Sequence, residues 1–421
     1  MRKTSELRRD STIITACFTL SFCAGPFYVL TVFFTSLEAD FGWSRTLISS
    51  LHSTFLLMAV PSNLIIGWMT DRYGPKLPLL ACGLFLGVGL VLISQVQSIG
   101  QVLLFYALAS LGAAALGTVP WATVQRLLPP ERLGLGLGIA TAGTSVSRLV
   151  LSPISSLLLL TFGWRTAYIF IGVVTWLLVS IAALLLPSRR KQKPEISGNA
   201  HPHETQLTTA ETKASSHTLE AEKQMSFKEI IRTKAFLLTC LMFMFPIACN
   251  QMVGVHIVPF AEGVGISKTS AATAAGLMGA FGLAGNITWP AFSGKISWRW
   301  LVVITTVGCS MMMVVLMATS SLWMLYLFVV FYGFFFFGNM PTRLGFARYL
   351  FGSQSLASTT GILLSAGALF GMFTTIASGY IYDTTESYSI AFIIGAVLFA
   401  MAAFIAVILK RPARSQDNSA L

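Results

Sequence analysis

The sequence has little charge, and acidic residues are the scarcer kind. Of its 421 residues only 10% are charged, whereas 55% are hydrophobic. A soluble globular domain carries about 25% charged residues, so this composition excludes a single water-soluble core. It predicts an all-α polytopic membrane protein, for which the lipid bilayer is the first partner.

Basic residues exceed acidic ones, 28 against 16, and the formal net charge is +12. These basic residues do not form a patch interleaved with aromatics, which a nucleic-acid surface would require. They fall between apolar segments, where retention of Lys and Arg on the cytoplasmic side of a membrane predicts them. No nucleic-acid partner is therefore expected.

Metal-ligand spacing is also absent. All six cysteines lie in apolar runs and are expected to be small buried hydrophobic residues. Nothing resembles a nucleotide-binding P-loop, and no paired acids or Ser/His/Asp constellation falls at membrane depth. We therefore expect no cofactor, no metal and no enzymatic activity. A cleavable signal peptide is not expected, because the first apolar run is too long and lacks a small-residue cleavage site.

Apolar segments long enough to cross a bilayer core of about 30 Å number six before a polar break and six after it. Their approximate bounds are 12–36, 46–70, 77–96, 100–128, 133–161, 166–187, 233–260, 270–294, 300–319, 321–347, 354–382 and 388–409. The predicted organisation is an N-terminal six-helix bundle (1–187), a cytoplasmic linker with a short amphipathic helix near "SFKEIIRTKAF" (188–232), a C-terminal six-helix bundle (233–410) and a cytoplasmic tail (411–421).

The loops alternate in Lys and Arg content. One set, with both termini and the linker, is rich in them, and the other holds little beyond Arg45, Arg165 and Lys268. The rich side is predicted to be cytoplasmic, which places both termini inside a multi-pass protein of the cell (cytoplasmic or inner) membrane.

The two halves repeat each other. "GIATAG" (138–143) in the fifth segment matches "GILLSAG" (361–367) in the eleventh, and "FGWSRTLISS" (41–50) matches "VGISKTSAAT" (264–273). Parallel repeats of six helices are typical of transporters in which one bundle rocks against the other to give alternating access.

A motif at the end of the second segment has a narrower meaning. "GWMTDRYGPK" (67–76) resembles the G-x-x-x-D-R-x-G-x-K/R signature of the major facilitator superfamily, and "GKISWRW" (294–300) is a degenerate copy that lacks the acid. The resemblance implies twelve helices in two halves, and a conformational latch at this loop. It assigns Asp71 and Arg72 to gating.

Further stretches look like the monocarboxylate porter and oxalate/formate antiporter branches of that family. They are "DFGWSR" (40–45), "RLGLGLGIATAG" (132–143), "VHIVPFAEGVGIS" (255–267) and "GYIYDTTESYSIAF" (379–392). The resemblance implies a small carboxylate as substrate, moved with a proton or by exchange, by a protein that functions as a monomer.

The sequence departs from those branches where they hold the substrate. In the eighth segment Asn286 occupies the place of an acid or Asn, and Pro290 stands where the resemblance implies an Arg. The eleventh segment lacks the Lys of the oxalate type, because residues 355–382 contain no basic residue. The cation for a carboxylate must then come from elsewhere.

Arg148 is the candidate. It lies 16 residues past Arg132, about 24 Å along a helix, and so deep in the hydrocarbon region. An arginine there costs at least about 2.5–3.5 kcal/mol on insertion scales, so it should face the bundle interior. Its planar fork suits a carboxylate. The alternative is a structural arginine that pairs with backbone carbonyls or a polar neighbour.

Other polar residues within the apolar segments are further candidates for substrate binding, each with a packing role as its alternative. Arg343 lies about 7.5 Å inside the cytoplasmic end of its helix and could equally extend to the interface. The remaining candidates are Tyr28, Asn250, Gln251, Asn286, Tyr332 and Asn339.

No acid falls in the centre of any predicted segment. A proton carrier, if one exists, would then be His52 or His256, whose ordinary pKa of about 6.5 suits the task. Each also has a structural alternative. Otherwise the substrate carboxylate carries the proton, or the protein exchanges anions.

These observations predict a secondary active transporter of small organic anions, a monocarboxylate, by proton symport or anion exchange. The alternative within the same fold is an exporter of amphipathic or drug-like compounds. A single central cation without an acid argues against a cationic substrate.

Overall fold

The computed structural model of the chain describes residues 2–25, 33, 37, 40–42, 45–187, 227–352 and 355–410. Within these residues the fold is entirely helical. The N-terminal half contains α1 (Arg2–Phe22), α3 (Arg45–Tyr73), α4 (Lys76–Ile93), α5 (Ile99–Leu127) and α6 (Pro130–Leu185). The C-terminal half contains α9 (Lys234–Gly263), α10 (Lys268–Ala291), the 3-10 turn η4 (Phe292–Gly294), α11 (Trp298–Met317), α12 (Leu322–Phe351), α13 (Leu356–Thr385) and α14 (Ser389–Ile408).

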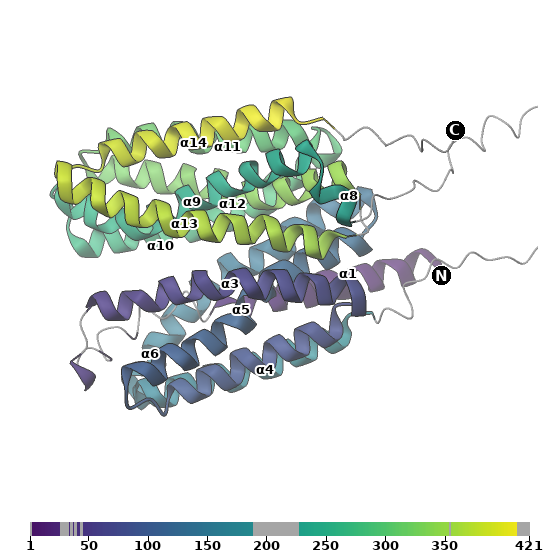
Figure 1. Ribbon diagram of the computed structural model, residues 1–421, viewed down its shortest axis with the longest axis horizontal. Coiled ribbons are helices and arrows are strands. Elements are labelled where there is room, and N and C mark those ends of the chain that lie inside the picture. The colour runs from purple at the N-terminus through teal and green to yellow at the C-terminus, as the bar shows by residue number, and fades with distance from the viewer. Residues whose placement is uncertain are drawn as a thin grey trace, which may run out of the picture.

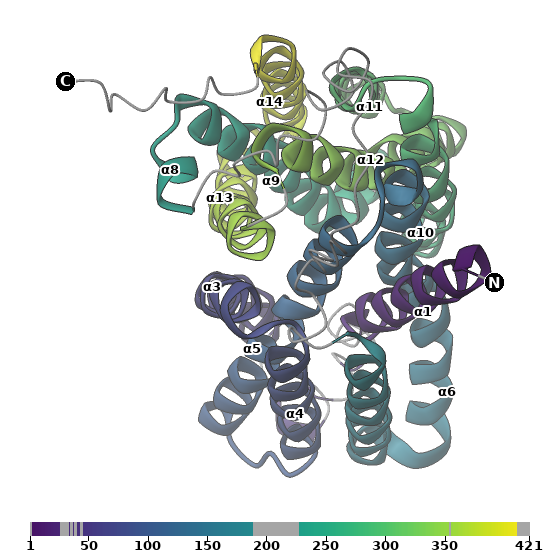
Figure 2. The same ribbon diagram turned by 90° about the vertical axis from the view of Figure 1, so that its right-hand side faces the viewer.

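The two halves lie side by side with their helices roughly parallel to one long direction (Figure 1). The start of α1 and the end of α14 lie at the same end of the molecule, which we call the terminal end, and the opposite end is the far end. Figure 2 looks along the helices and separates the two groups of helices. This is the arrangement that the repeat in the sequence predicts.

Among the described residues, nine helices are long and apolar enough to cross a membrane. One of them, α6, has 56 residues, about 84 Å of helix, and is therefore two spans in sequence. Gly163 separates them: its φ of 77° lies in the left-handed region that glycine adopts without strain. This break falls between the predicted segments 133–161 and 166–187.

Several helices begin as their sequences suggest. The side-chain oxygens of Ser98, Thr233 and Ser267 accept hydrogen bonds from backbone N–H groups of the first turns of α5, α9 and α10, at 3.4, 3.0 and 3.3 Å. These caps satisfy donors that would otherwise be unpaired at a helix start. A short helix, α8 (Phe227–Ile231), also forms where the amphipathic turn was predicted.

The first helix extends beyond the predicted apolar segment. That segment begins near residue 12, whereas α1 begins at Arg2. A count of apolar residues misses the N-terminal part of α1, because that part is polar and extends the helix beyond the apolar region. Asp10 anchors it there through an ion pair of 2.7 Å with Arg132 at the start of α6.

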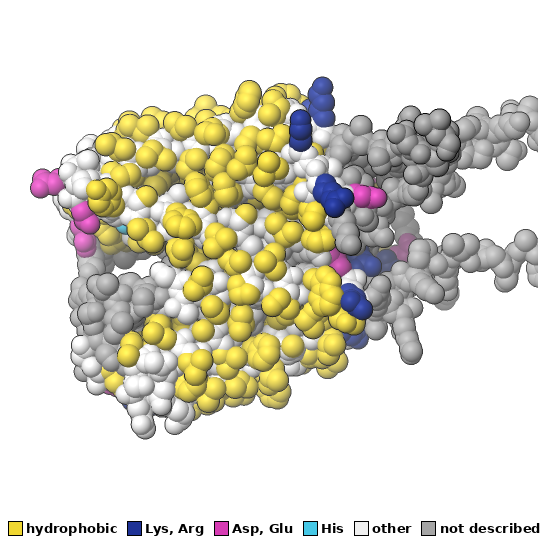
Figure 3. All heavy atoms as spheres, viewed as in Figure 1, with side chains coloured by type: hydrophobic (Ala, Val, Ile, Leu, Met, Phe, Trp, Pro, Cys, Tyr) yellow, Lys and Arg dark blue, Asp and Glu magenta, His cyan; other side chains and the backbone are white. Residues whose placement is uncertain are grey.

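The outer surface has the distribution expected of a bilayer protein. Figure 3 shows apolar side chains over the sides of the molecule, with Lys and Arg gathered at the terminal end of this face.

Candidate functional site

The most extensive contacts between the halves are made by two pairs of helices: α3 packs on α13, and α6 packs on α10. Both pairs approach through glycine. A Cβ built on Gly67 would lie 2.7 Å from the carbonyl oxygen of Ala357, and one on Gly138 would lie 2.5 Å from that of Asn286. No side chain fits at either position, so the backbones themselves are in contact.

Asp71 is placed by α3 against the first turn of α13. Its carboxylate oxygens accept hydrogen bonds from the backbone N–H groups of Ser358, at 2.8 Å, and of Ala357, at 3.4 Å. The first N–H groups of a helix have no partner within the helix, and the helix dipole favours an anion there. Asp71 of the N-terminal half thus caps a helix of the C-terminal half.

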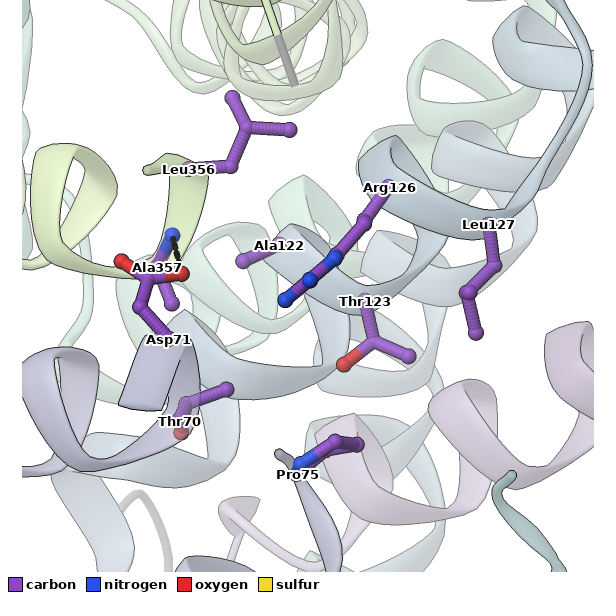
Figure 4. Close-up of a pocket in the computed structure, with 9 residues that line it drawn as sticks. All are labelled: Thr70, Asp71, Pro75, Ala122, Thr123, Arg126, Leu127, Leu356 and Ala357. Carbon is purple, nitrogen blue, oxygen red and sulfur yellow. Dashed lines mark hydrogen bonds between the residues drawn. The ribbon is translucent and has the colours of Figure 1, made fainter. Parts of the chain in front are cut away.

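Arg126 of α5 completes this contact. It points into a small pocket whose lining includes Asp71, Thr123 and the first residues of α13 (Figure 4). Its positive charge attracts the Asp71 carboxylate. The pocket lies at the terminal end, and residues of both halves line it.

Arg72, the other predicted gating residue, points away from this contact. It is exposed, and its guanidinium lies over the rings of Trp68 and Tyr73, at 5.3 and 5.5 Å from their centroids. A second cross-half bond comes instead from Arg348 of α12, whose Nη1 donates to the carbonyl oxygen of Leu128 at 3.1 Å.

Arg148 lies on α6 at the interface between the halves. Its guanidinium carbon is 5.4 Å from the centroid of the Phe337 ring, which α12 carries in the opposite half. One turn earlier on the same helix face, the Ser145 hydroxyl accepts a hydrogen bond of 3.0 Å from the amide nitrogen of Asn286 on α10. The structure therefore brings two predicted residues, Arg148 and Asn286, to one cross-half contact.

Two other predicted residues, Arg343 and Asn339, lie inside the C-terminal half. Arg343 is fully buried, donates from Nη1 to the carbonyl oxygen of Phe243 at 2.9 Å, and stacks on that ring at 4.9 Å. The Asn339 amide donates to the hydroxyls of Thr305 and Thr306, at 2.8 Å each. Each of these contacts is made within the half.

Tyr332 is equally buried and lies between Phe328 and Phe336, with ring centroids 4.9 and 5.6 Å away. Its hydroxyl has no hydrogen-bond partner among the described residues. On α9, Asn250 is half-buried with an unpartnered side-chain oxygen in the described part of the chain. Its neighbour Gln251 packs against α13 at Gly371.

His256 is buried in the C-terminal half. Its Nε2 lies 3.1 Å from the carbonyl oxygen of Thr375, and its Nδ1 lies 3.3 Å from the Tyr388 hydroxyl. The carbonyl can only accept, so Nε2 carries a proton and donates. Tyr28 lies outside the described residues, as does the side chain of His52.

A second small pocket lies among α9, α13 and α14. Its lining is almost entirely apolar, with Cys249, Met252, Ile381, Ile394 and Leu398 among its residues. It offers no charged group to hold a carboxylate.

A family model described as the Major Facilitator Superfamily matches residues 16–362, and again residues 248–420. The chain belongs to the major facilitator superfamily. It is thus a transporter of the multi-pass membrane class and not an enzyme. The first match spans the N-terminal half and continues into α13, and the second lies in the C-terminal half.

Two curated relatives are similar over different parts of the chain. Monocarboxylate transporter 12 of Rattus norvegicus is 22% identical over 397 residues, which are 91% of this chain and 81% of that protein. The oxalate:formate antiporter of Oxalobacter formigenes is 23% identical over 186 residues, 44% of each. Among solved structures, the proton:xylose symporter XylE bound to 6-bromo-6-deoxy-D-glucose has a TM-score of 0.78 at 14% identity and covers 96% of both chains. That likeness concerns the fold.

Several residues at the contact between the halves were not predicted from the sequence. Arg126 and Arg348 lie in the last turns of apolar helices and look like interfacial charges, yet the first lines a pocket together with Asp71 and the second binds a backbone carbonyl. Phe337 lies in a run of four phenylalanines, where no pattern marks one ring above the others. Ser145 could have been found, because it lies one helical turn before Arg148 and shares its face.

Proposed function

We propose that this major facilitator protein is a secondary active transporter of small organic anions, with a monocarboxylate as substrate. Similarity to monocarboxylate transporters and to an oxalate:formate antiporter supports the substrate class. We further propose that Arg148 is the cation that binds the substrate carboxylate.

The contact of Arg148 with Phe337 across the two halves carries this proposal. Placing an arginine side chain in the hydrocarbon region costs free energy, so such residues face the bundle interior or a water-filled cavity. A substrate-binding cation of an alternating-access transporter must lie where both halves can reach the substrate. Arg148 meets that condition, whereas Arg343 hydrogen-bonds within its own half.

The contacts between the halves suggest how the cycle runs. Three contacts would hold the halves together. Asp71 accepts hydrogen bonds from the start of α13, and Arg348 donates to the carbonyl oxygen of Leu128, both at the terminal end. The third is the close approach of α6 and α10 at a glycine. A substrate would enter from the far end, opposite these contacts, and pair with Arg148. Rocking of the halves would then break the terminal contacts and release the substrate on that side.

We place the terminal end in the cytoplasm of a cell that carries this protein in its plasma or inner membrane. Lys and Arg gathered at that end support this orientation. Because Arg148, Asn286 and the gate all come from one chain, a monomer would suffice for transport.

For proton coupling we propose His256. Its Tyr388 partner can donate to a neutral Nδ1 or accept from a protonated one, so the ring can take up a proton without losing either hydrogen bond. Asn286, Asn250 and Gln251 would add neutral polar contacts around the path. Exchange of anions would need no protonated side chain.

Counterflow in proteoliposomes tests the substrate class. Vesicles loaded with unlabelled lactate, pyruvate, formate or oxalate are placed in a trace of the same labelled acid, at two pH values. We expect transient accumulation of at least one monocarboxylate and none of a labelled lipophilic cation. Accumulation of the cation alone would contradict the proposal and favour an exporter of amphipathic compounds.

A further inference from the structure

A hydrogen bond joins the two halves deep along α6. The Asn286 amide of α10 donates to the Ser145 hydroxyl at 3.0 Å, and the two residues are buried, with 1% and 0% exposure. Ser145 lies about 22 Å along α6 from the start of that helix at the terminal end. The bond therefore lies deeper in the molecule than the contact of Asp71 with α13.

Between this bond and the terminal end, the backbones of α6 and α10 are in direct contact. A Cβ on Gly134 would overlap the carbonyl oxygen of Pro290, and one on Gly138 would lie 2.5 Å from that of Asn286. Approach this close exists only while α6 lies against α10. Alternating access requires the halves to separate at the terminal end, so this contact and the bond beyond it belong to the closed state.

The other pair of helices, α3 and α13, has no such bond at the equivalent position. The sequence repeat, continued along the chain, pairs Asn286 with Asn63 and Ser145 with Ala368. Asn63 accepts a hydrogen bond from Thr118 of its own half, and Ala368 has no hydroxyl to offer. The polar bond is therefore a feature of α6 and α10, and the packing of the repeat does not require it.

The bond acts on the two states of the transporter in different ways. While the halves are in contact, the Asn286 amide is shielded from water, and Ser145 supplies the acceptor that it needs. A buried amide without a partner costs free energy, whereas an amide that faces a water-filled opening is hydrated. Loss of the Ser145 hydroxyl should therefore destabilise the closed state and leave the open state unchanged.

We propose that the Ser145–Asn286 hydrogen bond is an inner latch of the terminal end: it forms when α6 closes on α10, and it breaks in each cycle when the halves separate there. The inference depends neither on the substrate nor on the residue that binds it. It differs from a hinge, in which the same bond would persist in both states.

The test is the rate at which a maleimide labels a cysteine placed at Thr123 in the purified protein without substrate. Thr123 lines the terminal pocket and is 4% exposed while the halves are in contact. Labelling of the same variant without that cysteine is subtracted. Ser145→Ala should raise the rate about 5- to 150-fold, as expected when a buried group loses its partner in one of two states.

Ser147→Ala is the matched control. Ser147 is also fully buried on α6, but its hydroxyl has no hydrogen-bond partner among the described residues and lies against Gly25 in the same half. Its labelling rate should stay within about twofold of the wild type, because no bond between the halves is lost. In an Asn286→Leu background, Ser145→Ala should cause no further rise, since the amide that it would leave unpaired is absent.

Equal labelling rates in Ser145→Ala and the wild type would overturn the inference. If the melting temperature of Ser145→Ala fell while its labelling rate stayed the same, the bond would be a hinge that persists in both states. A rise in Ser147→Ala as large as that in Ser145→Ala would also overturn the inference. So would an equal further rise in the Asn286→Leu background.

Discussion

The Asp71 carboxylate should hold the terminal end closed, and Asp71→Asn should open it. The substitution keeps the size of the side chain but leaves one carbonyl oxygen for the two backbone N–H groups of Ala357 and Ser358. It also removes the negative charge at the start of α13 and near Arg126.

The size of the effect can be worked from these contacts. A hydrogen bond to a charged group contributes about 1.5–3 kcal/mol, and a charge at a helix N-terminus about 0.3–1 kcal/mol. Asn retains part of the hydrogen-bond contribution. The closed state should therefore be destabilised by about 1–3 kcal/mol relative to the open state. That corresponds to a shift of about 5- to 150-fold in the equilibrium between them.

A cysteine placed at Thr123 reports this equilibrium. Thr123 lines the terminal pocket and is nearly buried while the halves are in contact. In Asp71→Asn the rate of maleimide labelling at Thr123→Cys should rise about 5- to 150-fold, after subtraction of the background from the same protein without that cysteine.

Arg72→Gln is the matched control, because Arg72 is exposed and stacks on Trp68 and Tyr73. Its labelling rate should stay close to that of the wild type. Equal rates in Asp71→Asn and the wild type would refute the reasoning, as would an equal rise in Arg72→Gln.

Three further substitutions test other contacts. Gly138→Ala should force α6 away from the Asn286 carbonyl at a cost of about 1–3 kcal/mol, and should raise the same labelling rate. Arg343→Ala should lower the free energy of unfolding by about 2–5 kcal/mol, because it leaves a cavity and removes the hydrogen bond to Phe243. The melting temperature should fall accordingly, and that of Arg343→Met should lie between those of Arg343→Ala and the wild type. His256→Gln should flatten the pH dependence of uptake between about pH 5 and 8 if this ring carries the proton, and an unaltered profile would assign the proton elsewhere.

Much of the helical layout could be predicted from the sequence, because a bilayer forces each span to be apolar over a known length. The break at Gly163 and the short α8 fell where composition indicated them. The start of α1 did not, because its first part is polar and is stabilised by the Asp10–Arg132 ion pair from a distant segment.

Positions along a helix were predictable, but directions around it were not. In α12 apolar residues cover every side, so no amphipathic face indicates which way Tyr332, Asn339 or Arg343 points. Asn339 contacts α11 and Arg343 contacts α9, so both side chains point into the C-terminal half. Arg348 was hidden for another reason: its partner is a backbone carbonyl, which no side-chain pattern reveals.

The central claim is that Arg148 binds the substrate carboxylate, and equilibrium binding of a labelled carboxylate to purified Arg148→Gln tests it most directly. Loss of a buried, hydrogen-bonded charge partner costs about 2–5 kcal/mol, so the affinity should fall at least about thirtyfold while the melting temperature without ligand stays near that of the wild type. Arg148→Lys should lie between the two, because it keeps the charge and loses the fork. An Arg148→Gln protein that is folded and binds the carboxylate with wild-type affinity would contradict the account.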